Sequence, residues 1–511
     1  MDELSGEKKE KRTQNLSQKD ISFDNKNTPP PTLILSEVNQ SVIGRITDNG
    51  LGTKYPIFVF ICLYTSLMAD GVEMTLMNLL IIPMRTYFNL SSFQIQAVAA
   101  TLFLGVAIGS LTSGWLSRSI GRVAILKATL FMLIISHLLM AASQNVGMFV
   151  CFRMIIGYLI GIIVPISLNL YSEYLPAKYR GFFILFSWFF LGLGLLFSGI
   201  IIYCQMPNLE ISKMKTVLMI QTVFSIIAFL WNCFFLHDSP RNLIINNSKE
   251  KAFDILKSMN KGIELSREEK KAVVDEILSQ ANITIEGNIS DLFSKQYLMT
   301  TILCIFLFLV HAGSFAGVYV ISTLTEQELS IEQEEVNNTK IIKTQIITAF
   351  VSLFAYILGG ILTDIKVFGR KGVLAVWIFV NGVMMLPSVY FPKLFTLLFS
   401  IAMFSTHIWG NVLVTYIIEI YPTKLRDIST GFLLMTLRIF SFFAQFLYLG
   451  LLEIHYKIPY YLTTVLLLLG VIATIILPFE SVKKPLDIQY EEEKDGFIKG
   501  NFLKEDNEKT S

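Results

Sequence analysis

The sequence contains twelve apolar runs of about 20 residues, and no other feature restricts the possible folds as strongly. A run of that length crosses the hydrocarbon core of a bilayer as an α-helix. Six runs precede residues 238–296 and six follow them, which predicts two halves of six spans each. The runs cover residues 56–82, 93–117, 123–143, 147–170, 181–203, 214–236, 297–322, 341–363, 371–391, 394–418, 428–452 and 458–478.

Charged residues are scarce and unevenly distributed along the 511-residue chain. They make up 16% of the sequence, whereas about 25% is usual for a soluble domain. Three segments, 1–55, 238–296 and 479–511, hold 50 of the 82 charged residues. This pattern excludes a soluble globular enzyme, and the net charge of +2 gives no reason to expect a nucleic-acid partner.

These patterns together predict an all-α membrane protein with twelve transmembrane helices in two pseudo-symmetric six-helix bundles. The bundles are expected at 56–237 and 297–478, with disordered cytoplasmic tails at 1–55 and 479–511. Residues 238–296 are expected to form a cytoplasmic linker with two short amphipathic helices. The helical spacing of Ala252, Ile255, Leu256 and Met259 predicts one, and that of Val274, Ile277, Leu278 and Ala281 predicts the other.

Basic residues in the connections between spans predict the orientation of the chain. The connections after spans two, four, eight and ten hold ten Lys and Arg residues, whereas the six connections on the opposite side hold seven. Lys and Arg are retained on the cytoplasmic side of membrane proteins. We therefore expect both tails and the linker in the cytoplasm, and a plasma membrane or an intracellular vesicle membrane fits equally well.

An eight-residue pattern recurs at the end of the fourth span of each half. Residues 173–180 read EYLPAKYR and residues 419–426 read EIYPTKLR, with Glu, Pro, Lys and Arg at identical spacing. Proline interrupts a helix, so the Glu and the Arg lie where two helix ends meet. We interpret Glu173, Arg180, Glu419 and Arg426 as gate residues that pair across the bundle when the cytoplasmic side is closed. The alternative is that they only anchor helix ends at the interface.

Further motifs resemble those of the major facilitator superfamily over residues 56–480. The loop motif G-x-L-x-D-R-x-G-R is matched by Gly114, Leu116, Gly121 and Arg122, and a second time by Gly360, Leu362, Asp364, Gly369 and Arg370. Asp238-Ser-Pro-Arg241 is similar to the P-E-S-P-R motif, and Leu477-Pro-Phe-Glu480 to the L-P-E-T ending. The resemblance implies gating roles for Gly114, Gly121, Arg122, Asp238, Arg241, Asp364, Gly369, Arg370 and Glu480.

Within that superfamily the sequence most resembles the branch of synaptic vesicle glycoprotein relatives and organic-ion transporters. This rests on Asp70-Gly-Val-Glu73-Met, on the pattern at 173–181, and on Arg438. Sugar porters share several motifs, but their glutamine-rich seventh span is absent here, so sugar is an alternative substrate class. The chain also departs from the superfamily at Arg118, which occupies an acidic position of the loop motif.

Four full charges lie well inside the predicted spans: Asp70, Glu73, Arg153 and Arg438. A charged residue at a helix centre costs about 2.5–3.5 kcal/mol on insertion scales, so these side chains should face a cavity or one another. Asp70 and Glu73 are three residues apart and share a helix face. Either acid could be a proton site, and the alternative is a permanent structural pair between one of them and Arg153.

Polar residues of spans seven, ten and eleven complete the candidate binding site. Arg438, with Ser441 and Gln445 on its helix face, is interpreted as binding an anionic or polar group of a substrate. His311 in span seven and His407 with Asn411 in span ten occupy the second half's equivalents of spans one and four. For these histidines, hydrogen-bonded packing is the alternative.

The sequence carries no motif of an enzyme, of ATP-driven transport or of a metal site. Duplicated six-helix halves are typical of transporters that rock about a central site. We expect a monomeric secondary transporter of a small organic solute, without a cofactor, that is proton-coupled or facilitative. The departure at Arg118 motivates a different class of function, a transport-inactive membrane receptor that retains the fold.

Overall fold

Helices make up all the regular structure in the described part of the chain. The computed structural model describes residues 54–172, 174, 180–245, 248–260, 262–283, 288–332, 338–363, 369–421 and 423–478. Among these residues, twelve helices or helix runs are long and apolar enough to cross a membrane. The predicted all-helical fold with twelve spans is therefore confirmed.

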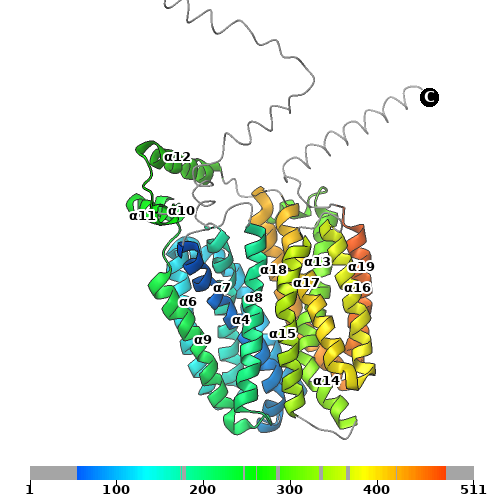
Figure 1. The fold of residues 1–511 in the computed structure, drawn as a ribbon. Helices are drawn as coiled ribbons and strands as arrows, with labels where there is room; N and C mark the ends of the chain where they lie inside the picture. The colour runs from blue at the N-terminus through cyan, green and yellow to red at the C-terminus, as the bar shows by residue number, and fades with distance from the viewer. Residues whose placement is uncertain are drawn as a thin grey trace, which may run out of the picture.

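The first half consists of six single helices, coloured blue to green in Figure 1. They are α4 (Lys54–Tyr87), α5 (Ser92–Ile120), α6 (Arg122–Ala141), α7 (Val146–Ser172), α8 (Arg180–Gln205) and α9 (Met214–Phe235), with the short turn η1 (Ile211–Lys213) before α9.

The second half repeats this plan with one interrupted span. Its seventh span consists of α13 (Leu298–Ala312), the π-helical segment η3 (Gly313–Gly317) and α14 (Val318–Glu332). The span therefore runs ten residues beyond the predicted end at residue 322. The remaining elements are α15 (Asn338–Thr363), α16 (Gly369–Tyr390), η4 (Pro392–Leu394), α17 (Phe395–Ile420), α18 (Thr423–Ile454) and α19 (Ile458–Ile476).

Three short helices follow α9 in the linker, with a turn, η2 (Ile289–Phe293), before α13. They are α10 (Pro240–Ile245), α11 (Lys249–Met259) and α12 (Arg267–Ile283). The predicted helix carrying Ala252, Ile255, Leu256 and Met259 is confirmed as α11, and those four residues are its buried ones. The second predicted helix is confirmed as α12, whereas α10 was not predicted.

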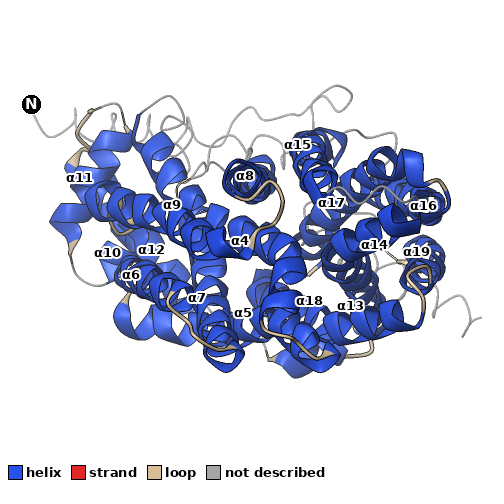
Figure 2. Ribbon diagram, turned by 90° about the horizontal axis from the view of Figure 1, so that it is seen from below, coloured by secondary structure: helices blue, strands red, loops and turns tan. Residues whose placement is uncertain are grey.

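The two halves form two bundles that lie side by side, and Figures 1 and 2 show them from two directions. Helices α4, α5 and α8 of the first bundle face α14, α15 and α18 of the second. The helices α10 to α12 lie beyond one end of the bundles, which we call the linker end. The opposite end, where α14 finishes, is called the distal end.

Local sequence explains several helix boundaries. Ser91 and Gln94 form a reciprocal capping box that starts α5. At the linker end, α5 and α6 are separated by the single residue Gly121, whose φ of +96° suits glycine, and Gly369 begins α16 with a φ of +61°. Each copy of the repeated loop motif therefore has a glycine with positive φ where a helix begins.

Glycines allow a close contact between α5 and α7 in the first bundle. A methyl group on Gly157 would lie 2.2 Å from the carbonyl oxygen of Leu102, and one on Gly161 would lie 2.3 Å from that of Val106. Only glycine allows the two backbones to approach this far. The contact holds Arg153, one turn before Gly157, against the interior of the bundle.

Candidate functional site

Glu73 of α4 is the centre of a charged network inside the first bundle. Its Oε2 accepts a hydrogen bond of 3.0 Å from Nη1 of Arg153 on α7, and its Oε1 lies 2.9 Å from Nε2 of His137 on α6. Arg153 also donates from Nε to the carbonyl oxygen of Val98 at 3.1 Å. His137 bonds through Nδ1 to the hydroxyl of Ser225 on α9 at 3.2 Å. The network around this carboxylate thus joins five spans, α4, α5, α6, α7 and α9.

Asp70 lies one turn before Glu73 on α4 but has a different partner. Its Oδ2 accepts a hydrogen bond of 3.2 Å from Nη2 of Arg438 on α18. The Asp70 side chain is 1% exposed and that of Arg438 is 12% exposed. This ion pair crosses from the first bundle to the second near the midpoint of both helices. Asp70 Oδ1 has no hydrogen-bond partner among the described residues.

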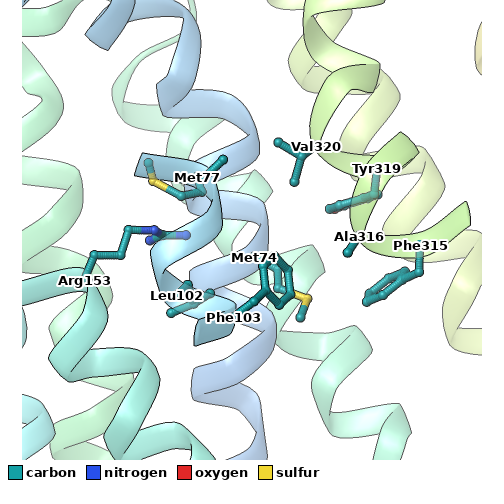
Figure 3. Close-up of a pocket in the computed structure, with 10 residues that line it drawn as sticks. Met74, Met77, Leu102, Phe103, Arg153, Phe315, Ala316, Tyr319 and Val320 are labelled. Atoms are coloured by element: carbon teal, nitrogen blue, oxygen red, sulfur yellow. The ribbon is translucent and has the colours of Figure 1, made fainter. Parts of the chain in front are cut away.

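A cavity of about 10 Å³ lies between the bundles next to these charges. Figure 3 shows Arg153 and Met77 on one side of it and Tyr319 with Phe315 on the other. Such a volume holds about one water molecule, whereas sites for organic ligands measure roughly 300–1,000 Å³. This cavity is therefore too small for an organic solute in this conformation.

The second bundle holds imidazole and aromatic groups at its centre. His407 Nδ1 bonds to the hydroxyl of Tyr356 at 2.8 Å, and its ring meets that of Phe315 at 5.2 Å. The His311 ring packs edge-on against Trp409 at 4.9 Å. Asn411 is buried on the same helix as His407, and its Nδ2 has no partner among the described residues.

Ser441 and Gln445 lie on the Arg438 face of α18, but both use their polar atoms within the bundle. The Ser441 hydroxyl donates to the backbone oxygen of Leu437, one turn back, at 2.8 Å. The Gln445 amide donates at 2.7 Å to the carbonyl oxygen of Ala316, within η3. Gln445 thus satisfies a backbone group where the seventh span departs from α-helical geometry.

Arg370 and Glu419 are the predicted gate residues that the structure brings together. Nη2 of Arg370, at the start of α16, lies 2.6 Å from Oε1 of Glu419, at the end of α17. Both helices belong to the second bundle, so in this conformation the pair joins neighbouring helices of one bundle.

The remaining gate residues lie at the linker end or outside the described residues. Arg122 starts α6 and is half-buried; Asp238 follows α9 and is half-buried; Arg241 is exposed on α10; Gly114 is exposed on α5. Arg180 and Arg426 lie in helices but their side chains are outside the described part, as is that of Arg118. Glu173, Asp364 and Glu480 lie outside the described residues altogether.

The described hydrogen bonds between the bundles extend from the middle of the helices to the distal end. Thr75 of α4 bonds to the hydroxyl of Tyr319 at 3.2 Å, and the Thr323 hydroxyl donates to the backbone oxygen of Asn78 at 2.8 Å. The Asn78 amide donates to Gln345 of α15 at 3.1 Å. We call these contacts of α4 with α14 and α15 the distal gate, and the gate is closed in this structure.

Sequence reasoning missed a buried histidine and a buried glutamate, His137 and Glu326. His137 lies in the third predicted span, where a single histidine in an apolar run was its only signal. Glu326 of α14 is 2% exposed. The expectation of four charges inside the spans was therefore wrong, because the seventh span continues past residue 322, where the sequence turns polar.

Comparisons with known proteins agree with this architecture. The synaptic vesicle 2-related protein of Xenopus laevis is 28% identical over 256 residues, which are 50% of this chain and 45% of that protein. The chain thus matches less than half the length of that relative. The organic cation/carnitine transporter 7 of Arabidopsis thaliana is 23% identical over 85% of this chain and 93% of its own.

Solved structures show the same fold. The xylose transporter XylE from E. coli, in a partially occluded inward-open conformation, superposes with a TM-score of 0.68 at 18% identity. The alignment covers 85% of this chain and all of that one. The family described as sugar (and other) transporter matches residues 36–492, nearly the whole chain. The chain therefore belongs to the sugar (and other) transporter family, within the major facilitator superfamily.

Proposed function

We propose that this protein is a secondary transporter that moves a small organic solute across a membrane by alternating access. The observation that carries the proposal is the ion pair between Asp70 and Arg438, which joins the two bundles beside the central cavity. A buried ion pair costs desolvation energy for both groups, so it is a poor device for stability alone. Where the two bundles must separate, a charged solute can take the place of one partner of this ion pair.

Arg438 is the proposed anchor for the solute. Its planar guanidinium can bind a carboxylate or another polar group through two hydrogen bonds. Asp70 occupies the guanidinium in the closed structure and would compete with the solute for it. An organic anion or a zwitterion fits this chemistry best, and sugar is the alternative class, supported by the name of the family. Replacing Arg438 with Lys should weaken binding, and unchanged affinity would remove this role.

Glu73 is the proposed proton site. It lies beside Arg153, which lines the cavity, and His137 offers a second nitrogen at 2.9 Å. A proton on Glu73 would release Arg153 from the carboxylate and so couple protonation to the shape of the cavity. In a facilitative carrier, Glu73 and Arg153 would instead form a fixed structural pair. Dependence of solute uptake on a proton gradient distinguishes a proton-coupled transporter from a facilitative one.

We further propose that the linker end faces the cytoplasm, with both tails on that side. The excess of basic residues in the linker-end connections supports this orientation. The partition into bundles at 56–237 and 297–478 around a linker, and a monomeric state in the bilayer, belong to the same proposal. The pair of Arg370 and Glu419 would then lie on the cytoplasmic side as part of the gate there.

The decisive experiment is uptake into proteoliposomes. The purified protein would be tested with organic anions, organic cations, zwitterions and sugars, each with and without an inward proton gradient. We expect saturable uptake of at least one class. The absence of saturable uptake in every class would contradict transport and favour the receptor motivated by Arg118.

A substitution at Glu73 tests the coupling. Glu73→Gln should abolish accumulation driven by the gradient while leaving counterflow exchange intact, because only the proton step is lost. Glu453→Gln is a matched control, since Glu453 is exposed at the distal end of α18. Unchanged gradient-driven accumulation in Glu73→Gln would exclude Glu73 as the proton site.

A further inference from the structure

Glu326 is a buried acid that the proposed transport mechanism does not use. It lies in the distal half of α14 and is 2% exposed, whereas Glu332 at the end of the same helix is exposed. A buried ionised carboxylate requires a cationic partner or several hydrogen bonds. No ion pair among the described residues includes Glu326.

The two oxygens of Glu326 have different surroundings. Oε1 accepts a hydrogen bond of 2.7 Å from the hydroxyl of Thr344 on α15, and Thr344 is within 2.8 Å of the hydroxyl of Thr396 on α17. Oε2 is buried and has no hydrogen-bond partner among the described residues. The carboxyl group thus has one oxygen that accepts a hydrogen bond and one buried oxygen that accepts none from the described residues.

Few charged or titratable groups surround this carboxyl. Lys340, one turn before Thr344 on α15, attracts it without forming an ion pair, and Tyr460 of α19 is a buried neighbour. Lys393 of η4 is exposed, and so is Glu453 at the end of α18. From α4, the side chain that meets α14 near this level is the uncharged Asn78.

The position of Glu326 on α14 connects it to the distal gate. Tyr319 and Thr323 of the same helix make the hydrogen bonds to α4 that close the gate. Thr323 lies one turn before Glu326 on the same helix face. A movement of this helix segment would therefore move both residues together. In the closed structure α14 packs against α4 and α15, and Glu326 is buried.

We propose that Glu326 is a proton-binding site whose protonation holds the distal gate closed. The proton would sit on Oε2 and be taken up from water on the distal side when the gate is open. Closing the gate over an ionised carboxylate would leave a bare buried charge, whereas closing it over a neutral carboxyl would not. The closed state therefore binds the proton more strongly than the open state, and by linkage the proton favours closure.

The contacts favour a proton over a sodium ion as the ligand. A metal cation needs several oxygen ligands around one point, whereas Thr344 is the one side chain recorded within hydrogen-bond distance of the carboxylate in the described part. A proton needs only the carboxyl itself.

The test measures the width of the distal gate by electron paramagnetic resonance distances at different pH values. Spin labels would be placed at Glu210→Cys and Phe391→Cys, exposed sites near the distal ends of the two bundles, with the exposed Cys151, Cys204 and Cys233 changed to Ser. At low pH we expect the short-distance population to dominate. As pH rises, the ratio of open to closed protein should increase by up to about tenfold per pH unit, the limit for one proton.

Variants of two of the three acids of α14, Glu326 and Glu332, provide the decisive comparison. Glu326→Gln mimics the neutral carboxyl and should keep the gate closed at every pH. Glu332→Gln is the matched control and should respond to pH like the parent. Thr344→Val removes the hydrogen bond to the carboxylate and should move the midpoint of opening to higher pH, which provides a second, independent variant.

Three results would overturn the proposal. These are an unchanged pH response in Glu326→Gln, a lost response in Glu332→Gln, and opening at constant pH that depends on replacing sodium with potassium. The measurement needs no substrate, so it can succeed or fail independently of the proposed transport activity.

Discussion

The centres of the two bundles occupy equivalent places in a duplicated fold but contain different chemistry. Spans one and four of the first half bring together Glu73 and Arg153, with His137 as a third member. Spans seven and ten of the second half bring His311 against Trp409, and His407 bonds to Tyr356. One centre depends on full charges and the other on rings and neutral hydrogen bonds.

This difference indicates which half is sensitive to a single substitution. A buried carboxylate that loses its cation is left with an uncompensated charge, whereas an imidazole that loses a hydroxyl partner loses one neutral hydrogen bond. Replacing a single charged residue of the first centre should therefore destabilise the protein strongly. The second should tolerate changes one group at a time, as expected of a surface that adapts to a solute.

The largest effect is expected at Arg153. Arg153→Met should lower the free energy of unfolding by about 3–5 kcal/mol, because Glu73 would remain buried without its cation. The measurement is thermal or chemical unfolding of the purified protein in detergent.

The double variant Glu73→Gln with Arg153→Met serves as the control for the cause. Removing both charges should recover much of the lost stability, since no unpaired charge remains. If the double variant is no more stable than Arg153→Met, lost packing of the arginine explains the effect and the contrast between the two centres is weakened.

A smaller effect is expected where glycines set the distance between helices. Gly157→Ala would place a methyl group 2.2 Å from the backbone oxygen of Leu102 on α5. The backbone of α5 cannot move aside as a flexible side chain can. The free energy of unfolding of the variant should therefore be lower by about 1–3 kcal/mol.

The second half offers the matched control for this contact. A methyl group on Gly359 of α15 would lie 3.8 Å from Ile408 of α17, which is an ordinary contact. Gly359→Ala should therefore leave the free energy of unfolding unchanged or raise it slightly, because alanine favours a helix more than glycine does. Equal losses in the two variants would show that the closeness of α5 and α7 has no special role.

The fold was predictable from sequence because its signals are local. Apolar runs of membrane-spanning length, and the repeat that ends at Arg180 and Arg426, establish twelve spans in two halves without knowledge of any contact. The helix break at Gly121 is likewise encoded by residues next to it in the chain.

The pairing of charges was not predictable, because it depends on which helices meet. Asp70 and Glu73 are three residues apart on one helix, and sequence reasoning treated either as the proton site. A step of three residues turns a helix by about 60° short of a full turn and advances it by about 4.5 Å. That offset is enough to direct Asp70 to the second bundle and Glu73 into the first. Glu326 was missed for a related reason, since the polar residues in the second half of the seventh span lowered the hydropathy of a segment that other helices bury.

The smallest effect is expected at Tyr356. Tyr356→Phe retains the ring and removes the hydroxyl that bonds to His407 at 2.8 Å. The free energy of unfolding should therefore fall by only about 0.5–1.5 kcal/mol. The same unfolding assay used for Arg153→Met makes the two values directly comparable. A loss of about 3 kcal/mol or more would mean that His407 carries a charge in the folded protein, because only a charged partner makes one hydrogen bond that important. In that case both centres would depend on buried charge, and the division of the duplicated fold into a charged half and a neutral half would not hold.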